Sequence, residues 1–340
     1  MKLYYYKSAL GNFGDDLNAW IWDRLLPNFF DNDDNTRFSG IGTIINTEMP
    51  DANKWIVFGS GIGYGHPPKG FGGNKWDIVS VRGPLSAQIL GLGKEKYITD
   101  GAALLNTLSE FTPCAENERS GTIFIPHHNA LDKGPWERGC QRANVEFVNP
   151  RGEATEIIQK IRRSRLVLAD AMHAAIIADA MRVPWVPMVT SSQINTFKWL
   201  DWTQTISCPY MPIVVGSNFL QNVLHNRKVN LYGEKNFHPG EDVDEALKTF
   251  KKQQNLTDSV EGHKYINKVK SLYYRLPNKL FCLYESQVSK NRGERAIEYV
   301  TSRLLEATRN GGFLSEQNVF DENLDRLLNG INAVKNRYSK

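Results

Sequence analysis

Short apolar runs, each ending at a glycine or a polar residue, recur through the first 217 residues of the chain. The clearest unit spans 164–187, where an apolar run at 165–169 precedes a segment rich in Ala, Ile and Met at 171–181. A second apolar run begins at Val183. These segments predict a strand, a helix and a strand, an order that builds parallel sheets. We therefore expect an α/β protein.

The N-terminal part repeats the pattern of a strand that runs into glycine or a charged residue. Helices are expected at 17–25 and 85–90. Strands that end on one edge in this way describe a Rossmann-like layer. The four strand-like pieces lie at 3–7, 54–58, 77–82 and 96–101.

A second layer of the same kind is expected after 110–120, a stretch with little apolar content that we interpret as an interdomain linker. Its elements before the 164–187 unit are a strand at 121–128, a helix at 135–143, a strand at 145–149 and a helix at 153–163. An aromatic, amphipathic segment follows at 195–202, and its tryptophans favour core packing over a sugar platform.

From about residue 218 the strand signals stop. The predicted domains are therefore an N-terminal Rossmann-like domain at 1–112, a second one at 113–217 and a helical extension at 218–340. Within the extension, helices with charged faces are expected at 241–253, 259–289, 293–309 and 321–337.

The loop after the first predicted strand has the features of an anion-binding turn. Two glycines permit a tight turn, and the acidic and amide residues suit a helix cap, so backbone N–H groups would be exposed. The loop is neither the dinucleotide fingerprint nor a P-loop, and a purely structural turn is the alternative. Its candidate residues are Gly11, Asn12, Gly14, Asp15 and Asp16.

Further candidate site residues lie at the ends of the later predicted strands of the first layer. They are Gly59, Ser60 and Gly61 after the second piece, Arg82 at the end of the third, and Asp100 at the end of the fourth. An arginine on the same edge as two glycine turns is well placed to bind a carboxylate or a phosphate. A surface ion pair is the structural alternative.

Histidines mark the second layer. His173 falls in the first helical turn beside the carboxyl end of a strand, where open α/β sheets bind ligands. The helix dipole disfavours an imidazolium there, so we expect a neutral His173 that can accept a proton; a structural histidine is the alternative. Adjacent strand residues point to opposite faces, so at most one of His127 and His128 is expected to face a cleft. No Cys or Glu stands at ligand spacing from them, and no metal site is expected.

Composition places the chain among soluble globular proteins. It has 340 residues, of which 41% are hydrophobic and 23% charged, enough for two domains. No apolar run approaches the roughly 20 residues needed to cross a bilayer, and the start does not read as a signal peptide. The four cysteines stand far apart, as reduced thiols do, so a cytoplasmic location is expected.

The formal net charge of +4 is placed unevenly. Residues 1–224 carry 21 Lys and Arg against 22 Asp and Glu, whereas residues 225–340 carry 20 against 15. A solvated helical face is the first interpretation of the basic part, and peripheral contact with the inner face of the cytoplasmic membrane is the second. No basic motif interleaved with aromatics and no zinc finger is present, so no nucleic-acid partner is expected.

Together these motifs resemble the polysaccharide pyruvyltransferase family. Residues 3–205 carry the resemblance, through the loop at 11–16, the Gly59-Ser-Gly turn, Val81-Arg82 with Ser86, Thr99-Asp100, and the His173 helix that ends at Val183-Pro184. Ala171 stands where the commoner family form has an arginine, and Ala174 replaces a frequent glycine. With these two departures, and with Asn195 and Lys198, the chain resembles the branch of the family that decorates exopolysaccharides such as succinoglycan.

The resemblance implies a GT-B-like fold, with two Rossmann-like domains whose parallel sheets face each other across a cleft. It implies transfer of pyruvate from phosphoenolpyruvate, without a further cofactor, to a sugar of an exopolysaccharide repeat unit as a cyclic 4,6- or 3,4-ketal. The implied acceptor is a lipid-linked oligosaccharide. The family's catalytic arginine and histidine fall on Arg82 and His173.

Phosphoenolpyruvate carries a carboxylate and a phosphate, so its site needs cationic and N–H donors. We expect Arg82 to hold one of these anions and His173 to move a proton. The glycine turns would complete the substrate site together with Asp100, His127, His128, Asn195 and Lys198.

Two other functions stay open. A GT-B-type nucleotide-sugar glycosyltransferase would share the architecture, because a fold does not determine the chemistry. It predicts that a nucleoside diphosphate, and not phosphoenolpyruvate, raises the melting temperature. A non-catalytic component of polysaccharide assembly would be stabilised by neither.

Overall fold

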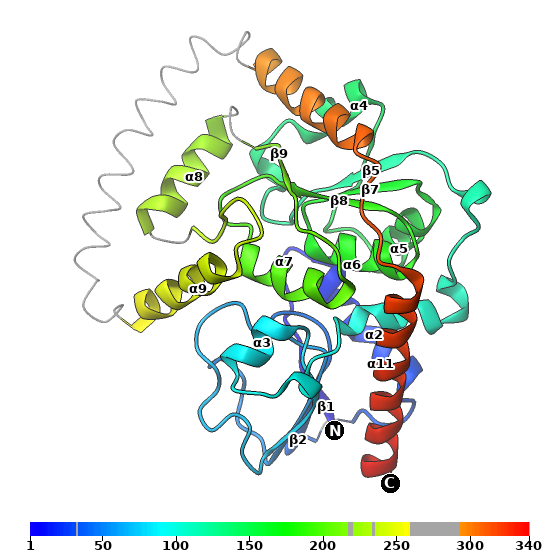
Figure 1. Ribbon diagram of the computed structural model, residues 1–340, viewed down its shortest axis with the longest axis vertical. Coiled ribbons are helices and arrows are strands. Elements are labelled where there is room, and N and C mark those ends of the chain that lie inside the picture. The colour runs from blue at the N-terminus through cyan, green and yellow to red at the C-terminus, as the bar shows by residue number, and fades with distance from the viewer. Residues whose placement is uncertain (32, 217–219, 233–234, 259–292, 340) are drawn as a thin grey trace.

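The computed structural model describes residues 1–31, 33–216, 220–232, 235–258 and 293–339. In this part of the chain two parallel sheets lie one above the other, with α6 and α7 between them (Figure 1). The α/β class and the two parallel layers are confirmed. The likeness to GT-B enzymes stays a prediction.

The first sheet has the strand order β1-β2-β3-β4, all parallel. Its central strand β3 is almost wholly buried, as strands covered on both faces are. The strands are β1 (Lys2–Leu3), β2 (Thr36–Ser39), β3 (Lys54–Phe58) and β4 (Trp76–Ser80). The sequence patterns gave no sign of β2, which is four residues long.

The prediction of a fourth strand for this layer, at 96–101, is wrong. Only a single bridge between Val81 and Tyr97 forms there among the described residues. Asp100 instead caps a 3₁₀ helix (Gly101–Thr107), since its carboxylate accepts a hydrogen bond from the Ala102 N–H at 3.0 Å. A capping aspartate followed by glycine turns the chain out of the sheet.

The second sheet has the strand order β6-β5-β7-β8-β9, again all parallel. The chain leaves β5 on one side to form β6 and returns on the other side to form β7. Ligands bind outside the carboxyl ends of strands at such a switch point. The strands are β5 (Thr122–Ile125), β6 (Glu146–Phe147), β7 (Leu166–Ala169), β8 (Trp185–Val189) and β9 (Ile213–Val214).

The helices of both layers follow the predicted order, except that the short helix α1 was not predicted. The first layer holds α1 (Phe13–Asp16), α2 (Asn18–Leu25) and α3 (Pro84–Ile89), and the second holds α4 (Trp136–Ala143), α5 (Ala154–Arg163), α6 (Met172–Ala180) and α7 (Thr196–Thr203). The prediction of a strand, a helix and a strand around His173 is confirmed by β7, α6 and β8.

Helix α7 joins the two halves, although it follows the second sheet in sequence. It lies so close to α3 that a Cβ on Gly83 would stand 1.8 Å from the Asp201 carbonyl oxygen. Two further links are the hydrogen bond from Asn195 Nδ2 to the Gly63 carbonyl at 2.9 Å and that between the Thr205 and Thr99 hydroxyls at 2.8 Å.

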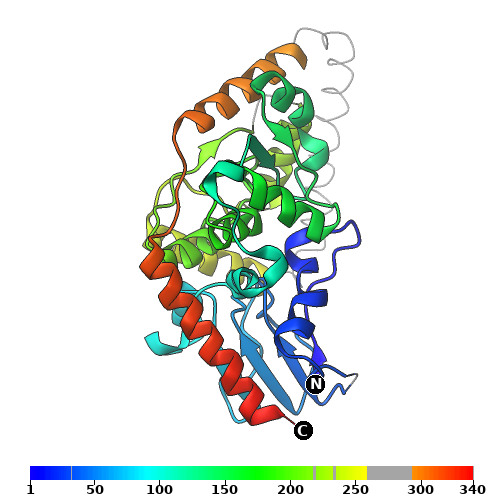
Figure 2. The same cartoon turned by 90° about the vertical axis from the view of Figure 1, so that its right-hand side faces the viewer.

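The C-terminal helices divide between the two layers. A helix at 293–309 packs on the second layer, where Arg303 donates a hydrogen bond to the Val214 carbonyl at 2.9 Å. Helix α11 (Gln317–Tyr338) instead returns along the first sheet, so both chain ends lie there (Figures 1 and 2). Its contacts include the ion pair between Arg337 and Asp77 at 2.5 Å. These two helices of the tail are therefore packed onto the layers rather than set apart from them.

Two more helices precede these, α8 (Leu220–Tyr232) and α9 (Val243–Asp258). The predicted helices at 241–253, 293–309 and 321–337 correspond to described helices, whereas 259–289 lies outside the described residues.

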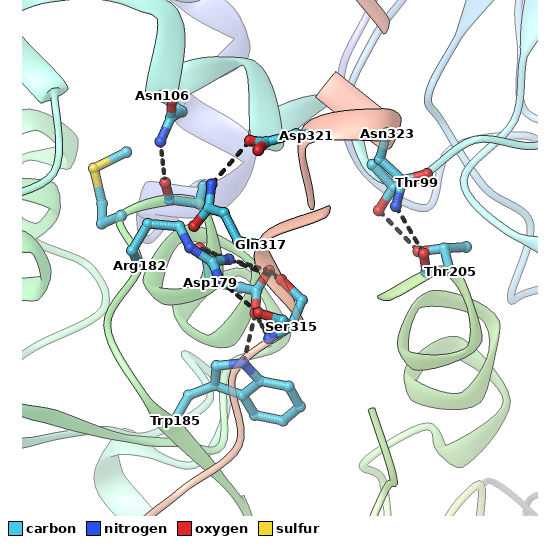
Figure 3. A network of polar contacts seen from close by, with 12 residues as sticks. Thr99, Asn106, Asp179, Arg182, Trp185, Thr205, Ser315, Gln317, Asp321 and Asn323 are labelled. Carbon is cyan, nitrogen blue, oxygen red and sulfur yellow. Dashed lines mark hydrogen bonds and ion pairs between the residues drawn. The ribbon is translucent and has the colours of Figure 1, made fainter. Parts of the chain in front are cut away.

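The segment between the last two helices is fixed by a polar network (Figure 3). Asp179 accepts hydrogen bonds from the Ser315 amide at 2.9 Å and the Ser315 hydroxyl at 2.7 Å. Arg182 donates to the same hydroxyl at 2.8 Å, and Trp185 donates its indole N–H to Asp179 at 3.3 Å. The chain is thereby held against α6 where it crosses from one layer to the other.

Candidate active site

A cavity of about 550 Å³ opens between the two halves, at the switch point of the second sheet. Its walls come from the loops after β1, β2 and β3 on one side and from the ends of β5 and β7, with α6 and α7, on the other. Seven predicted site residues line it: Asn12, Asp15, His127, His128, His173, Asn195 and Lys198. Eight do not: Gly11, Gly14, Asp16, Gly59, Ser60, Gly61, Arg82 and Asp100.

The glycine loop is a contact between the two halves. Gly11 has a left-handed φ of +83°, and a Cβ there would stand 3.0 Å from the Arg151 carbonyl oxygen. The Phe13 amide donates to the Pro150 carbonyl at 3.1 Å. A Cβ on Gly14 would stand only 2.1 Å from Nδ1 of His173. The two glycines therefore place the loop against the second layer, and neither of them lines the cavity.

Asp15 brings a carboxyl group into the cavity wall. Asn12 donates its side-chain amide to this carboxylate, and Gly42, with φ +106°, leaves room for it. Withdrawal from water raises the pKa of Asp15 to about 7, against the lowering effect of the Lys198 ammonium. A carboxyl with this pKa is partly protonated at neutral pH and can serve as an acid.

His173 lies in the first turn of α6, as predicted, half-buried beneath the cavity. Burial, with the charges of Lys198 and Arg82, lowers its pKa to about 3. It is therefore neutral at pH 7 and does not titrate near neutrality. Its Nε2 has no hydrogen-bond partner among the described residues. A neutral imidazole with an unpartnered nitrogen is suited to accept a proton from a bound hydroxyl.

His127 and His128 both line the cavity, with ring centroids 4.3 Å apart. The expectation that only one would do so is wrong, because β5 ends at Ile125 and both residues lie in the loop beyond it. The alternation of side chains holds only within the strand. Burial lowers the pKa of both, that of His128 to about 4, so both are neutral at pH 7.

Lys198 supplies the positive charge of the cavity. Among the described residues, no other Lys or Arg side chain lines the cavity. Asn195 caps α7 by accepting the Lys198 amide hydrogen at 3.2 Å, which sets the lysine at the start of the helix. The Lys198 ammonium lies 3.4 Å from the Tyr64 hydroxyl.

Arg82 is not placed as an anion ligand, contrary to the expectation from the sequence. It is fully buried, and its Nε donates to Asp201 at 2.9 Å. Its other nitrogens donate to the Thr43 hydroxyl at 2.8 Å and the Ile62 carbonyl at 3.2 Å. Thr43 lines the cavity, so the guanidinium lies directly behind its wall. The structural alternative of a surface ion pair is wrong as well, since the pair is internal.

The remaining predicted residues have supporting places. A Cβ on Gly61 would stand 2.6 Å from the Arg82 guanidinium, and one on Gly59 (φ +76°) would stand 2.8 Å from the Gly101 amide nitrogen. Ser60 is buried and accepts the Arg82 amide hydrogen on its carbonyl at 3.0 Å. Asp16 accepts the Asn12 amide hydrogen at 3.1 Å.

Two buried aspartates and three tyrosines were not predicted. Asp170 accepts hydrogen bonds from the His127 amide at 2.6 Å and from Thr190, and so fixes the ends of three strands. Asp201 binds Arg82 and Ser86. A signal existed for Asp170, which directly follows an apolar strand. Asp201 lies within an aromatic helix and gave none. The tyrosines that line the cavity are Tyr4, Tyr6 and Tyr64.

Within the described residues, no group of three or more His, Cys, Asp or Glu side chains is arranged to hold a metal ion. Nor does any helix of the described part combine the length and the apolar character needed to cross a membrane.

Residues 46–192 match the family model of the polysaccharide pyruvyl transferases, which supplies the class of protein. The chain is also 44% identical over 213 residues to the succinoglycan biosynthesis protein ExoV of Rhizobium meliloti (strain 1021), a match that covers 62% of this chain and 67% of that protein. No solved structure matches significantly. The chain belongs to the polysaccharide pyruvyl transferase family, and it is a pyruvyl transferase.

Proposed function

We propose that the cavity transfers pyruvate from phosphoenolpyruvate to two hydroxyls of one sugar in an exopolysaccharide precursor, giving a cyclic ketal and phosphate. The observation that carries this proposal is the convergence of Lys198, Asp15 and His173 from both halves on one cavity. One positive charge, one partly protonated carboxyl and one neutral imidazole provide the cation, the acid and the base that the proposed reaction uses.

Lys198 is the cation that draws the donor's anionic groups into the cavity. Arg82 acts in this proposal as a positioning residue and not as a ligand of the donor, because its buried pair with Asp201 holds the helix that carries Lys198. The neutral His127 and His128 can each donate one ring N–H to a phosphate oxygen.

In the first half of the reaction, Asp15 gives its proton to the methylene carbon of phosphoenolpyruvate. The first sugar hydroxyl attacks the adjacent carbon and passes its proton to Nε2 of His173. The carbon then carries a methyl group, the carboxylate, the phosphate and the sugar oxygen.

In the second half, phosphate leaves with the proton held by His173, and the second hydroxyl attacks the same carbon. Its proton returns to the Asp15 carboxylate. Both side chains regain their starting protonation states, and the products are the ketal and inorganic phosphate. No metal ion and no further cofactor enter this scheme.

The relative's part in succinoglycan biosynthesis supports an exopolysaccharide acceptor for this chain. We propose that the acceptor is lipid-linked and that the protein works at the inner face of the cytoplasmic membrane. The basic excess supports this, because residues 259–292 carry 7 Lys and Arg against 2 Asp and Glu. These residues lie outside the described part of the chain.

The direct test is incubation with phosphoenolpyruvate and candidate glucosides or galactosides, with mass spectrometry for the pyruvate adduct and an assay of released phosphate. His173→Ala should keep its fold and lose about 10²–10⁴-fold in turnover. Unchanged turnover would remove His173 from the mechanism. Stabilisation by a nucleoside diphosphate, and not by phosphoenolpyruvate, would favour a glycosyltransferase instead.

A further inference from the structure

Aromatic side chains line the part of the cavity wall that the loops after β1 and β3 form. Of the four large hydrophobic residues exposed in the described part of the chain, Tyr6 at 56% and Tyr64 at 44% line the cavity. Tyr4 lines it too, and its ring stands edge-on to Trp55 with centroids 5.3 Å apart. Exposed aromatic rings that gather at a cavity are typical of a binding surface.

Polar groups lie among these rings. Asn46, Thr47 and Glu48 line the cavity too, and Thr47 and Glu48 are exposed. The Tyr4 hydroxyl lies 3.5 Å from the Glu48 carbonyl oxygen. The Asn46 side-chain oxygen accepts the Glu48 amide hydrogen at 2.8 Å, which fixes the turn. Amide, hydroxyl and carboxylate groups beside aromatic rings match a sugar, whose C–H face packs on a ring while its hydroxyls form hydrogen bonds.

The charges in the cavity indicate which ligand binds beside the tyrosines and which beside Lys198. The Glu48 carboxylate repels a phosphate or a carboxylate, whereas Lys198 attracts them. Arg37 acts electrostatically on Tyr4, but it pairs with Asp34 and does not line the cavity. A doubly anionic donor is therefore favoured beside Lys198, and a neutral ligand beside the tyrosines.

Tyr64 lies close to Lys198 as well. Its ring centroid lies 5.0 Å from the Lys198 ammonium and its hydroxyl 3.4 Å from it. A ligand that rests on Tyr64 is thus placed next to the cation that holds the donor.

We propose that Tyr4, Tyr6 and Tyr64, with Asn46 and Glu48, form the acceptor subsite, which binds a neutral hexose of the saccharide with its ring stacked on a tyrosine. This inference rests on the proposed function. The subsite orients the sugar so that its reactive hydroxyls point towards Lys198 and His173.

The test compares Tyr6→Ala, Glu48→Gln and the control Met211→Ala, which removes an exposed large side chain (63%) that lies outside this cavity. In the transfer assay, Tyr6→Ala should raise the KM for the acceptor about tenfold, since the loss of one ring contact is of that order. The KM for phosphoenolpyruvate and kcat should stay within about twofold, and Met211→Ala should match the wild type. An unchanged acceptor KM in Tyr6→Ala and Glu48→Gln would overturn the proposal.

Binding of uncharged glucosides and galactosides, measured by saturation-transfer NMR without donor, separates this proposal from the function itself. A saccharide that binds the wild type and not Tyr6→Ala supports the subsite, even if no pyruvyl transfer occurs. Transfer with equal saccharide binding by the two proteins would leave the function standing and refute the subsite. Failure of the wild type to bind any of these hexosides would also refute it.

Discussion

At the scale of single residues, the environment shifts the pKa values of Asp15 and His173 in the directions that the proposed proton transfer needs. Burial acts on both, but it raises the pKa of an acid and lowers that of a base. It therefore keeps Asp15 partly protonated at pH 7, with a pKa of about 7, and His173 neutral, with a pKa of about 3. This separation of the two pKa values is the basis on which the proposed mechanism uses Asp15 as the acid and His173 as the base.

The pH dependence of kcat/KM tests this assignment. Because Asp15 must carry its proton, activity should fall as the pH rises through about 7, whereas His173, with a pKa of about 3, should give no acid limb between pH 5 and 7. Asp15→Asn should lower activity by about 10²–10⁴-fold and abolish the alkaline limb.

Other groups act on the Asp15 pKa, so the variant is needed to assign the limb. Lys198 and the Asn12 amide lower that pKa, while Asp16 and Asp100 raise it. Asp100 itself has a pKa of about 6, but it does not line the cavity. An alkaline limb that persists in Asp15→Asn would show that another group donates the proton.

At the scale of elements, the sequence predicts strands and helices whose pattern is carried by their own residues. The unit around His173 was predictable because its apolar runs, its helix formers and its prolines all agree. β2 was not, since only one of its four residues, Phe38, is apolar and the strand therefore carries no period. The grouping of Tyr4, Tyr6 and Tyr64 at the cavity was not predictable either, because the loops after β1 and β3 that carry them share no local sequence signal.

The contact of α1 with α6 makes a prediction about Gly14. Its φ is not left-handed, so alanine suits the backbone there, but the new Cβ would stand 2.1 Å from Nδ1 of His173. Gly14→Ala should therefore displace the imidazole, lower kcat by at least about tenfold and destabilise the fold by about 1–3 kcal/mol. Thermal unfolding and the transfer assay measure both effects.

Gly293→Ala is the matched control, because a Cβ added there would meet no atom of the described residues within 4 Å and its φ is likewise not left-handed. It should leave activity and stability unchanged. Wild-type kcat in Gly14→Ala would show that the loop and His173 separate in solution.

At the scale of the whole molecule, the cavity depends on how two layers are held together. Its walls come from both, so any movement between them changes the distance from Lys198 to Asp15. An ion pair joins the layers at this junction: Arg82 comes from the first layer, Asp201 comes from α7, and both side chains are fully buried. Around it, Ser86 donates its amide to Asp201 at 2.8 Å and its hydroxyl at 2.6 Å.

Removing one partner of such a pair leaves the other as an uncompensated buried charge. Arg82→Met should therefore destabilise the protein by about 3–5 kcal/mol, measured by denaturant unfolding. Arg138→Ala is the control, since its pair with Glu294 is exposed on both sides and should matter by less than about 1 kcal/mol. A double-mutant cycle of Arg82→Met with Asp201→Asn should show strong coupling between the two sites.

Two variants, Arg82→Lys and Arg82→Met, decide between two roles for this residue. If it holds the junction, Arg82→Lys should lose stability and activity together, because lysine keeps the charge but cannot donate to Asp201, Thr43 and the Ile62 carbonyl at once. If it binds the donor directly, Arg82→Met should keep wild-type stability and lose only its stabilisation by phosphoenolpyruvate. The burial of its guanidinium behind Thr43 favours the first outcome, and the second would restore the role that the sequence alone suggested.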